Sequence, residues 1–464
     1  MPHKLASPVL VLAVVAAGFA AAAQNPPPGQ ESGQPAPDQA APQQSSTVRV
    51  EIFGEPGSQP RYAVPDFLAP GGDADTVAAA RTIGQVLWDD LAFEREFYMI
   101  PRDTYASIPV ARSITDVPVD RWRELGADGL IMGMVQKTAT GLRVQVRLLN
   151  VRNGEAVYSR EYSGSASNPR FFAHTIADEI HQQQRALPGV ARTKLTFSSD
   201  RDRERLKGTV ENREVKEVYI ADYDGFNQRR VTTDRTLNIM PTWSPDARAI
   251  AFTSYRRGFP DVLIAHIYQG KLERPTGGAT QNWLPAWSPD GTKLVFTSNR
   301  DGNSELYVMN RDGSGVRRIT NHPAIDTTPT WSATGTQIAF TSDRSGTPQI
   351  YIMGADGLNV RRISTGSYCD RATWSPAPYN ELAYVCRSGP AYDIMLYNFA
   401  NAAAVPLTFG EGSNESPSFS PSGRHIAFTS TRAGKSQVFI VGRDGRGLRQ
   451  VTRVGNNFTP DWSN

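Results

Sequence analysis

Six short polar side chains recur at one position in the second half of the sequence. Five lie five residues before a Trp or Phe that is followed by Ser, and the sixth lies four residues before one. They are Asn238, Asn282, Asp326, Asp370, Asn414 and Asn457. Amides and carboxylates at the start of a strand can hydrogen-bond a partner, or can cap the strand itself through Asx turns. The pattern predicts a ring of partner-binding residues, and strand capping is the alternative.

The midpoint between the two cysteines of the chain, at 377.5, falls inside a turn expected at residues 376–380. Facing residues of an antiparallel hairpin are equidistant from its turn, so Cys369 and Cys386 can meet at a separation that a disulfide tolerates. In an oxidising compartment we expect the bond to form and to add about 3 kcal/mol of stability by closing a short loop. Two buried free thiols are the alternative.

Catalytic and metal-binding patterns are absent from the sequence. It contains no Gly-x-Ser-x-Gly motif, and its Asp-Gly turns lack the spaced carboxylates of a calcium loop. His174 and His181 lie seven residues apart on an expected helix and can share a face, but a metal pair there has no further nearby ligands. We predict no catalytic residue, no cofactor and no metal. The net charge of +3 also argues against nucleic-acid binding.

The elements that carry the polar ring form an internal repeat. Its aromatic residues are separated by 44, 44, 43, 45 and 43 residues, and they are Trp243, Trp287, Trp331, Trp374, Phe419 and Trp462. A period in the low forties with several short alternating strands is typical of a β-propeller blade. In the unit that starts at Pro285, strands are expected around Trp287 and at 294–298, 305–309 and 316–320.

The two ends of the repeat array predict how the ring closes. Residues 194–199, 217–221 and 229–232 match the second, third and fourth strands of a blade, with no first strand before them. Residues 460–463 supply a first strand with nothing after it. Five complete units and these two fragments predict a six-bladed propeller over 193–464, closed by the last strand, which leaves no long open edge.

The region before the propeller divides into three parts. Residues 1–23 have the apolar run and small-residue end of a signal peptide, and 24–46 form a Pro/Gln-rich stretch expected to be a flexible tether. Alternating and helical patterns over 47–187 predict a small α/β domain, with helices at about 75–93, 119–125 and 169–184. The first of these would be capped by Asp75 or Thr76. No later apolar stretch reaches the length of a membrane span.

The sequence resembles the TolB family of the Tol-Pal envelope system over its whole mature length. The resemblance rests on the domain order, on Trp287-Ser-Pro-Asp-Gly291 and on Phe296-Thr-Ser-Asn-Arg300 with its copies. It implies a periplasmic, monomeric, non-enzymatic scaffold that binds the lipoprotein Pal at the propeller channel mouth and supports outer-membrane integrity and constriction during division. It also implies contact with TolA through the mature N-terminus.

The sequence departs from the pattern of the TolB family in two places. Twenty-three Pro/Gln-rich residues precede the opening strand at 48–53, where typical members have few, which bears on the TolA contact. The blade at Trp374 has Ser375-Pro-Ala-Pro-Tyr379 in place of the usual turn.

The alternative function is a secreted propeller hydrolase or lyase acting on peptide or sugar at the same mouth. Turnover of a substrate, as opposed to capture of Pal, would distinguish the two.

Overall fold

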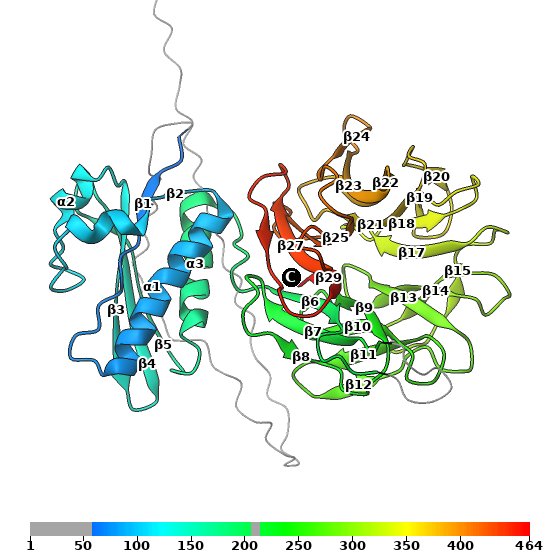
Figure 1. Ribbon diagram of the computed structural model, residues 1–464, viewed down its shortest axis with the longest axis horizontal. Helices are drawn as coiled ribbons and strands as arrows, with labels where there is room; N and C mark the ends of the chain where they lie inside the picture. The colour runs from blue at the N-terminus through cyan, green and yellow to red at the C-terminus, as the bar shows by residue number, and fades with distance from the viewer. Residues whose placement is uncertain (1–57, 206–213) are drawn as a thin grey trace, which may run out of the picture. The chain divides into compact units, whose positions relative to one another are not determined.

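A five-stranded sheet forms the centre of the α/β region. The computed structural model describes residues 58–205 and 214–464, so the expected strand at 48–53, the signal peptide and the tether lie outside the described residues. The sheet has the order β2-β1-β3-β4-β5, with β1 parallel to both neighbours and β3, β4 and β5 antiparallel (Figure 1). Its strands are β1 (Arg61–Ala63), β2 (Tyr98–Met99), β3 (Gly129–Thr138), β4 (Gly141–Asn150) and β5 (Ala156–Gly164).

Two long helices pack side by side in this region (Figure 1). The helices of the region are α1 (Ala74–Glu94), the 3₁₀ helix η1 (Arg102–Ser107), α2 (Val119–Glu124) and α3 (Pro169–Arg185). One face of α3 is apolar and buried, because Phe172, Ile176 and Ile180 lie in the core. The capping prediction for α1 is wrong: Asp73 is the N-cap and its carboxylate accepts from the Thr76 amide at 2.9 Å.

Six four-stranded sheets follow in the described residues and are arranged as the blades of a propeller (Figure 1). Three blades are β9 (Asn238–Trp243), β10 (Ala249–Ser254), β11 (Asp261–His266) and β12 (Lys271–Glu273); β13 (Asn282–Trp287), β14 (Lys293–Ser298), β15 (Glu305–Asn310) and β16 (Arg317–Arg318); and β17 (Asp326–Trp331), β18 (Gln337–Ser342), β19 (Gln349–Gly354) and β20 (Arg361–Arg362). Two more are β21 (Cys369–Trp374), β22 (Glu381–Ser388), β23 (Ala391–Asn398) and β24 (Ala403–Pro406); and β25 (Asn414–Phe419), β26 (His425–Ser430), β27 (Gln437–Gly442) and β28 (Arg449–Gln450).

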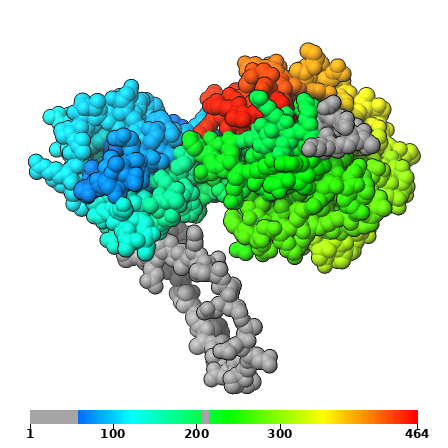
Figure 2. Space-filling view, turned by 60° about the horizontal axis from the view of Figure 1, so that its bottom comes forward, coloured from blue at the N-terminus to red at the C-terminus, as the bar shows by residue number. Residues whose placement is uncertain are grey.

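The last blade combines the two ends of the array, as the sequence predicted. Its strands are β6 (Lys194–Ser199), β7 (Glu217–Asp222), β8 (Arg229–Arg230) and β29 (Asn457–Trp462). β29 pairs antiparallel with β6, from Asn457 opposite Ser199 to Trp462 opposite Leu195. In Figure 2 the red C-terminal segment accordingly lies against the green segment. This pairing confirms the six-bladed, mainly β fold and its closure.

Each inner strand contains a bulge at its third residue. The six bulge residues have φ between 46° and 56°, although none is glycine; they are Met240, Leu284, Thr328, Arg371, Ser416 and Thr459. Threonines of the preceding blade hold three of these residues, because the amides of Leu284, Arg371 and Thr459 donate to threonine hydroxyls. The repeated Phe-Thr-Ser therefore links blades as well as filling their cores: its Phe is fully buried, as in Phe252 and Phe296.

No helix among the described residues is long and apolar enough to cross a membrane.

Candidate partner-binding site at the channel mouth

Five of the six residues of the predicted polar ring lie at the first residue of an inner strand, and these five are inaccessible. Five of its members have no exposed surface: Asn238, Asn282, Asp326, Asn414 and Asn457 are each 0% exposed. Asp370 is different, with 22% of its side chain exposed. A direct hydrogen bond to a partner is therefore open to Asp370 alone among the six, and the burial of the other five supports the strand-capping alternative.

Arginines from the same blade hold four of the buried side chains. Each arginine ends the Phe-Thr-Ser-x-Arg sequence or its equivalent. Arg300, Arg344, Arg432 and Arg201 donate to Asn282, Asp326, Asn414 and Asn457 at 2.8–3.0 Å. Arg344 also lies over the rings of Phe340 and Tyr351. Burial raises the pKa of Asp326, while hydrogen bonds from Ser342 and Arg344 act in the opposite direction.

A second set of polar residues completes this network, and sequence reasoning missed it. Each third strand contains a buried acid or amide, at its first residue or in β23 at its third, that accepts from a Thr or Ser hydroxyl 15 residues later. The pairs are Glu217 and Thr232, Asp261 and Thr276, Glu305 and Thr320, Gln349 and Ser364, Asp393 and Thr408, and Gln437 and Thr452. The amide of Asn238 joins the first pair by donating to Glu217 at 2.8 Å. The two members of each pair are always 15 residues apart, and this constant spacing is the sequence pattern that could have revealed them.

One blade replaces the polar contact by a covalent bond. Cys369 faces Cys386 across β21 and β22, and the two form a disulfide, as predicted. Cys369 thus occupies the position that Asn282 and Asp326 hold in their blades. The assignment of Asp370 to that position is wrong, because Asp370 is the second residue of β21 and pairs with Val385.

The second residues of the inner strands form a different ring, which we call the mouth ring. All six are partly exposed, in contrast to the buried residues that precede them. They are Phe458, Ile239, Trp283, Thr327, Asp370 and Glu415, in their order around the propeller. Three consecutive members are apolar and two are acidic. The mouth ring is therefore chemically asymmetric, with an apolar arc and an acidic arc.

The channel beyond the mouth ring contains one carboxylate and one cation among the described residues that line its cavities. A cavity of about 130 Å³ lies along the bulges and another of about 370 Å³ lies at the Trp-Ser end. Asp461 lines both, and Arg371 lines the first. The Asp461 carboxylate accepts from the Trp243 amide at 2.7 Å and from the Ser418 hydroxyl at 3.1 Å. Burial raises its pKa to about 6.

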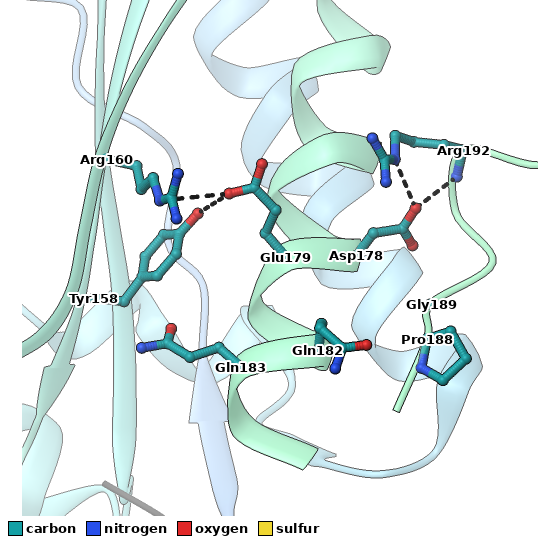
Figure 3. Close-up of a pocket in the computed structure, with 9 residues that line it drawn as sticks. All are labelled: Tyr158, Arg160, Asp178, Glu179, Gln182, Gln183, Pro188, Gly189 and Arg192. Carbon is teal, nitrogen blue, oxygen red and sulfur yellow. Dashed lines mark hydrogen bonds and ion pairs between the residues drawn. The ribbon is translucent and has the colours of Figure 1, made fainter. Parts of the chain in front are cut away.

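A separate cavity of about 440 Å³ lies in the α/β region, between α3, β5 and the residues after α3 (Figure 3). Its charged groups pair with each other. Glu179 accepts from the Tyr158 hydroxyl at 2.9 Å and lies 3.7 Å from Arg160, while Arg192 donates to Asp178 at 3.1 Å. The lining is thus already balanced in charge, and no predicted site residue lies in it.

Comparison with known proteins agrees with this architecture. The family model described as "TolB beta propeller domain" matches residues 188–464, and that described as "TolB amino-terminal domain" matches 48–157. A protein of Desulfosudis oleivorans named "Tol-Pal system protein TolB" is 33% identical over 211 residues, which are 45% of this chain and 46% of that protein. A protein of the same name from Jannaschia sp. is 32% identical over 48% of each chain. The chain thus spans about half the length of the curated relatives it matches.

A solved structure extends the likeness over both regions. The crystal structure of TolB from Acinetobacter baumannii superposes with a TM-score of 0.74 at 26% identity, and covers 89% of this chain and 98% of that one. The propeller model alone matches more than half of the sequence. The chain therefore belongs to the TolB family.

Proposed function

We propose that this chain is a periplasmic, monomeric, non-enzymatic scaffold of the Tol-Pal system that binds the lipoprotein Pal at the mouth ring. Through Pal it would support outer-membrane integrity and constriction during division. The observation that carries the proposal is the mouth ring itself, since six partly exposed residues lie at one repeat position beside a channel. Relatives named as Tol-Pal system proteins supply the identity of the partner.

The asymmetry of the mouth ring defines the chemistry expected of the Pal segment that docks there. The apolar arc of Phe458, Ile239 and Trp283 favours an aliphatic or aromatic side chain, because burying apolar area is the main source of affinity. The acidic arc of Asp370 and Glu415 favours a Lys or Arg on the opposite side of the same segment. Lys216, whose ammonium lies 3.8 Å from the centre of the Phe458 ring, would discourage a cation on the apolar side.

The five buried amides and carboxylates of the predicted ring act in this proposal as positioning residues. Each is the neighbour of one mouth-ring residue in the chain, and its contacts hold the start of the inner strand. For example, Asn282 accepts from Arg300 at 2.9 Å and precedes Trp283 directly. Their replacement would disturb docking through the backbone and would lower stability at the same time.

The N-terminal residues enter the proposal only through the sequence. Residues 1–23 would direct export, residues 24–46 would form the tether, and the mature N-terminus would contact TolA. All of these lie outside the described residues. The partition into an α/β domain at 47–187 and a propeller at 193–464 is part of the same proposal.

The proposal is tested by neutralising the acidic arc. The variant Asp370→Asn/Glu415→Gln should bind purified Pal at least tenfold more weakly, about 1.4 kcal/mol, because two carboxylates no longer face the cation. The matched control is Asp312→Asn/Glu124→Gln, which removes the same charge from a blade hairpin and from α2. Titration calorimetry at two salt concentrations gives the affinity and its electrostatic part. Full affinity in the acidic-arc variant, with unchanged melting, would exclude the mouth ring as the docking surface.

A further inference from the structure

A buried histidine of α3 lies against two carboxylates of the last blade. One ring nitrogen of His174 and one carboxylate oxygen each of Asp222 and Asp224 lie within 4.8 Å of one another. All three residues are buried, with exposures of 4%, 7% and 9%. Asp222 ends β7 and Asp224 lies in the turn that follows it. Residues about 50 positions apart in the sequence thus bring together one imidazole and two carboxylates.

The imidazole is oriented by a third carboxylate. The Nδ1 atom of His174 lies 2.8 Å from a carboxylate oxygen of Asp90 on α1, and the Tyr223 hydroxyl donates to the other Asp90 oxygen at 2.6 Å. The Nε2 atom of His174 is buried and has no hydrogen-bond partner among the described residues. A carboxylate on one ring nitrogen, with the other nitrogen left free, is the arrangement that positions histidine as a metal ligand.

The two carboxylates near the histidine already have cationic partners. Lys194 donates to Asp222 at 2.6 Å, and Arg170 pairs with Asp224. Asp90 adds a third carboxylate beside His174, and the Arg449 guanidinium donates to the backbone carbonyl oxygen of Asp224 at 3.5 Å. A carboxylate oxygen has two lone pairs, so Asp222 and Asp224 can keep their existing contacts while each offers an oxygen to an ion.

We propose that His174, Asp222 and Asp224 bind a divalent transition-metal ion of the Zn²⁺ class, with Asp90 as the positioning residue of the histidine. One nitrogen and two oxygen ligands suit Zn²⁺, whereas Ca²⁺ and Mg²⁺ prefer ligand sets made of oxygen alone. The ion would join α3 to the blade that β29 completes. The sequence predicted no metal, and the proposed site does not use His181, which instead contacts the carbonyl oxygen of Leu187 at 3.0 Å.

The test measures metal binding directly on the purified, tag-free chain after treatment with a chelator. Equilibrium dialysis against Zn²⁺, followed by elemental analysis, should find one ion per chain, and Zn²⁺ should raise the melting temperature. His174→Gln should lower the affinity at least about tenfold. The matched control is His181→Gln, a second buried histidine on the same helix, which should bind Zn²⁺ as the wild type does.

A second variant protects the test against misfolding. Asp222→Asn keeps the size of the side chain, so it should fold and still lose affinity. Mg²⁺ and Ca²⁺ at the same concentration should not displace Zn²⁺ from the wild type. Absence of Zn²⁺ binding by the wild-type chain, or equal binding by His174→Gln and Asp222→Asn, would overturn the proposal. Neither result would bear on the mouth ring, which is tested separately with Pal.

Discussion

The blades β17–β20 and β21–β24 join their first strand to their second strand by different kinds of bond. At the start of β17, buried Asp326 accepts two hydrogen bonds from Arg344, which holds the inner strand to the loop after β18. At the start of β21, a disulfide between Cys369 and Cys386 makes the connection instead. This blade has no equivalent arginine, since Ser388 stands at the position that Arg300 and Arg344 hold in their blades. The first residue of the inner strand is therefore linked to the second strand or to the loop after it in both blades, by hydrogen bonds in one and by a disulfide in the other.

Both kinds of link depend on a closed ring, so removing the closing strand should have the largest effect. Deletion of residues 459–464 takes most of β29 from β6 and removes buried Trp462, whose indole donates to Thr193 at 2.7 Å. We expect insolubility or a large fall in melting temperature, because a sheet edge and a core pocket are exposed together. Thermal unfolding of the truncated chain, followed by circular dichroism, is the measurement. Unchanged melting would contradict the role of β29.

Breaking the covalent link should have the next largest effect. The variant Cys369→Ser/Cys386→Ser should lose about 3 kcal/mol of unfolding free energy, because the unfolded chain regains the freedom of a short loop. Urea unfolding with and without reductant checks this. The reductant should destabilise the wild type and leave the variant unchanged. Equal sensitivity of both proteins would show that the disulfide carries no stability.

The blade closed by β29 differs from the others in a carboxyl group that should make the unfolding free energy depend on pH. Where β9 and β25 have Thr242 and Ser418 before the aromatic residue, β29 has the partly exposed Asp461, with a pKa raised to about 6. The unfolded carboxyl has a pKa near 4, so the folded chain holds the proton more tightly. This contribution is complete below about pH 4 and is lost as the pH rises to about 6, with a size of about 2 to 3 kcal/mol.

The measurement for Asp461 is a difference between two proteins. The unfolding free energy of wild type minus that of Asp461→Asn should fall between pH 4 and pH 7, because other titrating groups cancel. A difference that stays constant over this range would show that Asp461 does not titrate there.

The smallest expected effect comes from loosening one polar link. Asn282→Ala removes the acceptor of Arg300 and should cost about 1 to 2 kcal/mol. Thr327→Ala, at the partly exposed mouth ring, is the control and should cost less. Denaturant midpoints of the two variants make the comparison. For the same reason, replacing Asn282, Asp326 and Asn414 together would test folding more than docking, and a stable triple variant would contradict the link described here.

The sequence predicted those parts of the fold that repeat. The regular interval of the aromatic residues and the unmatched end strands were sufficient for six blades and their closure, and equal distances from a turn were sufficient for the disulfide. Asp370 was misassigned because residue type was given more weight than spacing: Cys369 lies five residues before Trp374, as Asn282 does before Trp287. The mouth ring could be identified only from the strand register of the structure, which places Cys369 first and Asp370 second in β21.

Other features depended on contacts that no local pattern contains. The burial of Asn282 and its equivalents arises because arginines of the same blade and third-strand acids of the preceding blade surround them. The sequence predicted that His174 lies on a helix. Its carboxylate neighbours, however, come from α1, from β7 and from the turn after β7, which only the folded chain brings together.

The pairing of β29 with β6 has a consequence for the order in which the chain can mature. The amide of Lys194 donates to the hydroxyl of Ser463, a residue 269 positions later. During synthesis, and during any passage across a membrane, β6 emerges long before the strand that covers its edge. For that interval its unpaired backbone is a template for other strands, including those of neighbouring copies. A chaperone that shields this edge until β29 arrives would therefore matter more for this chain than for one whose blades are completed one after another.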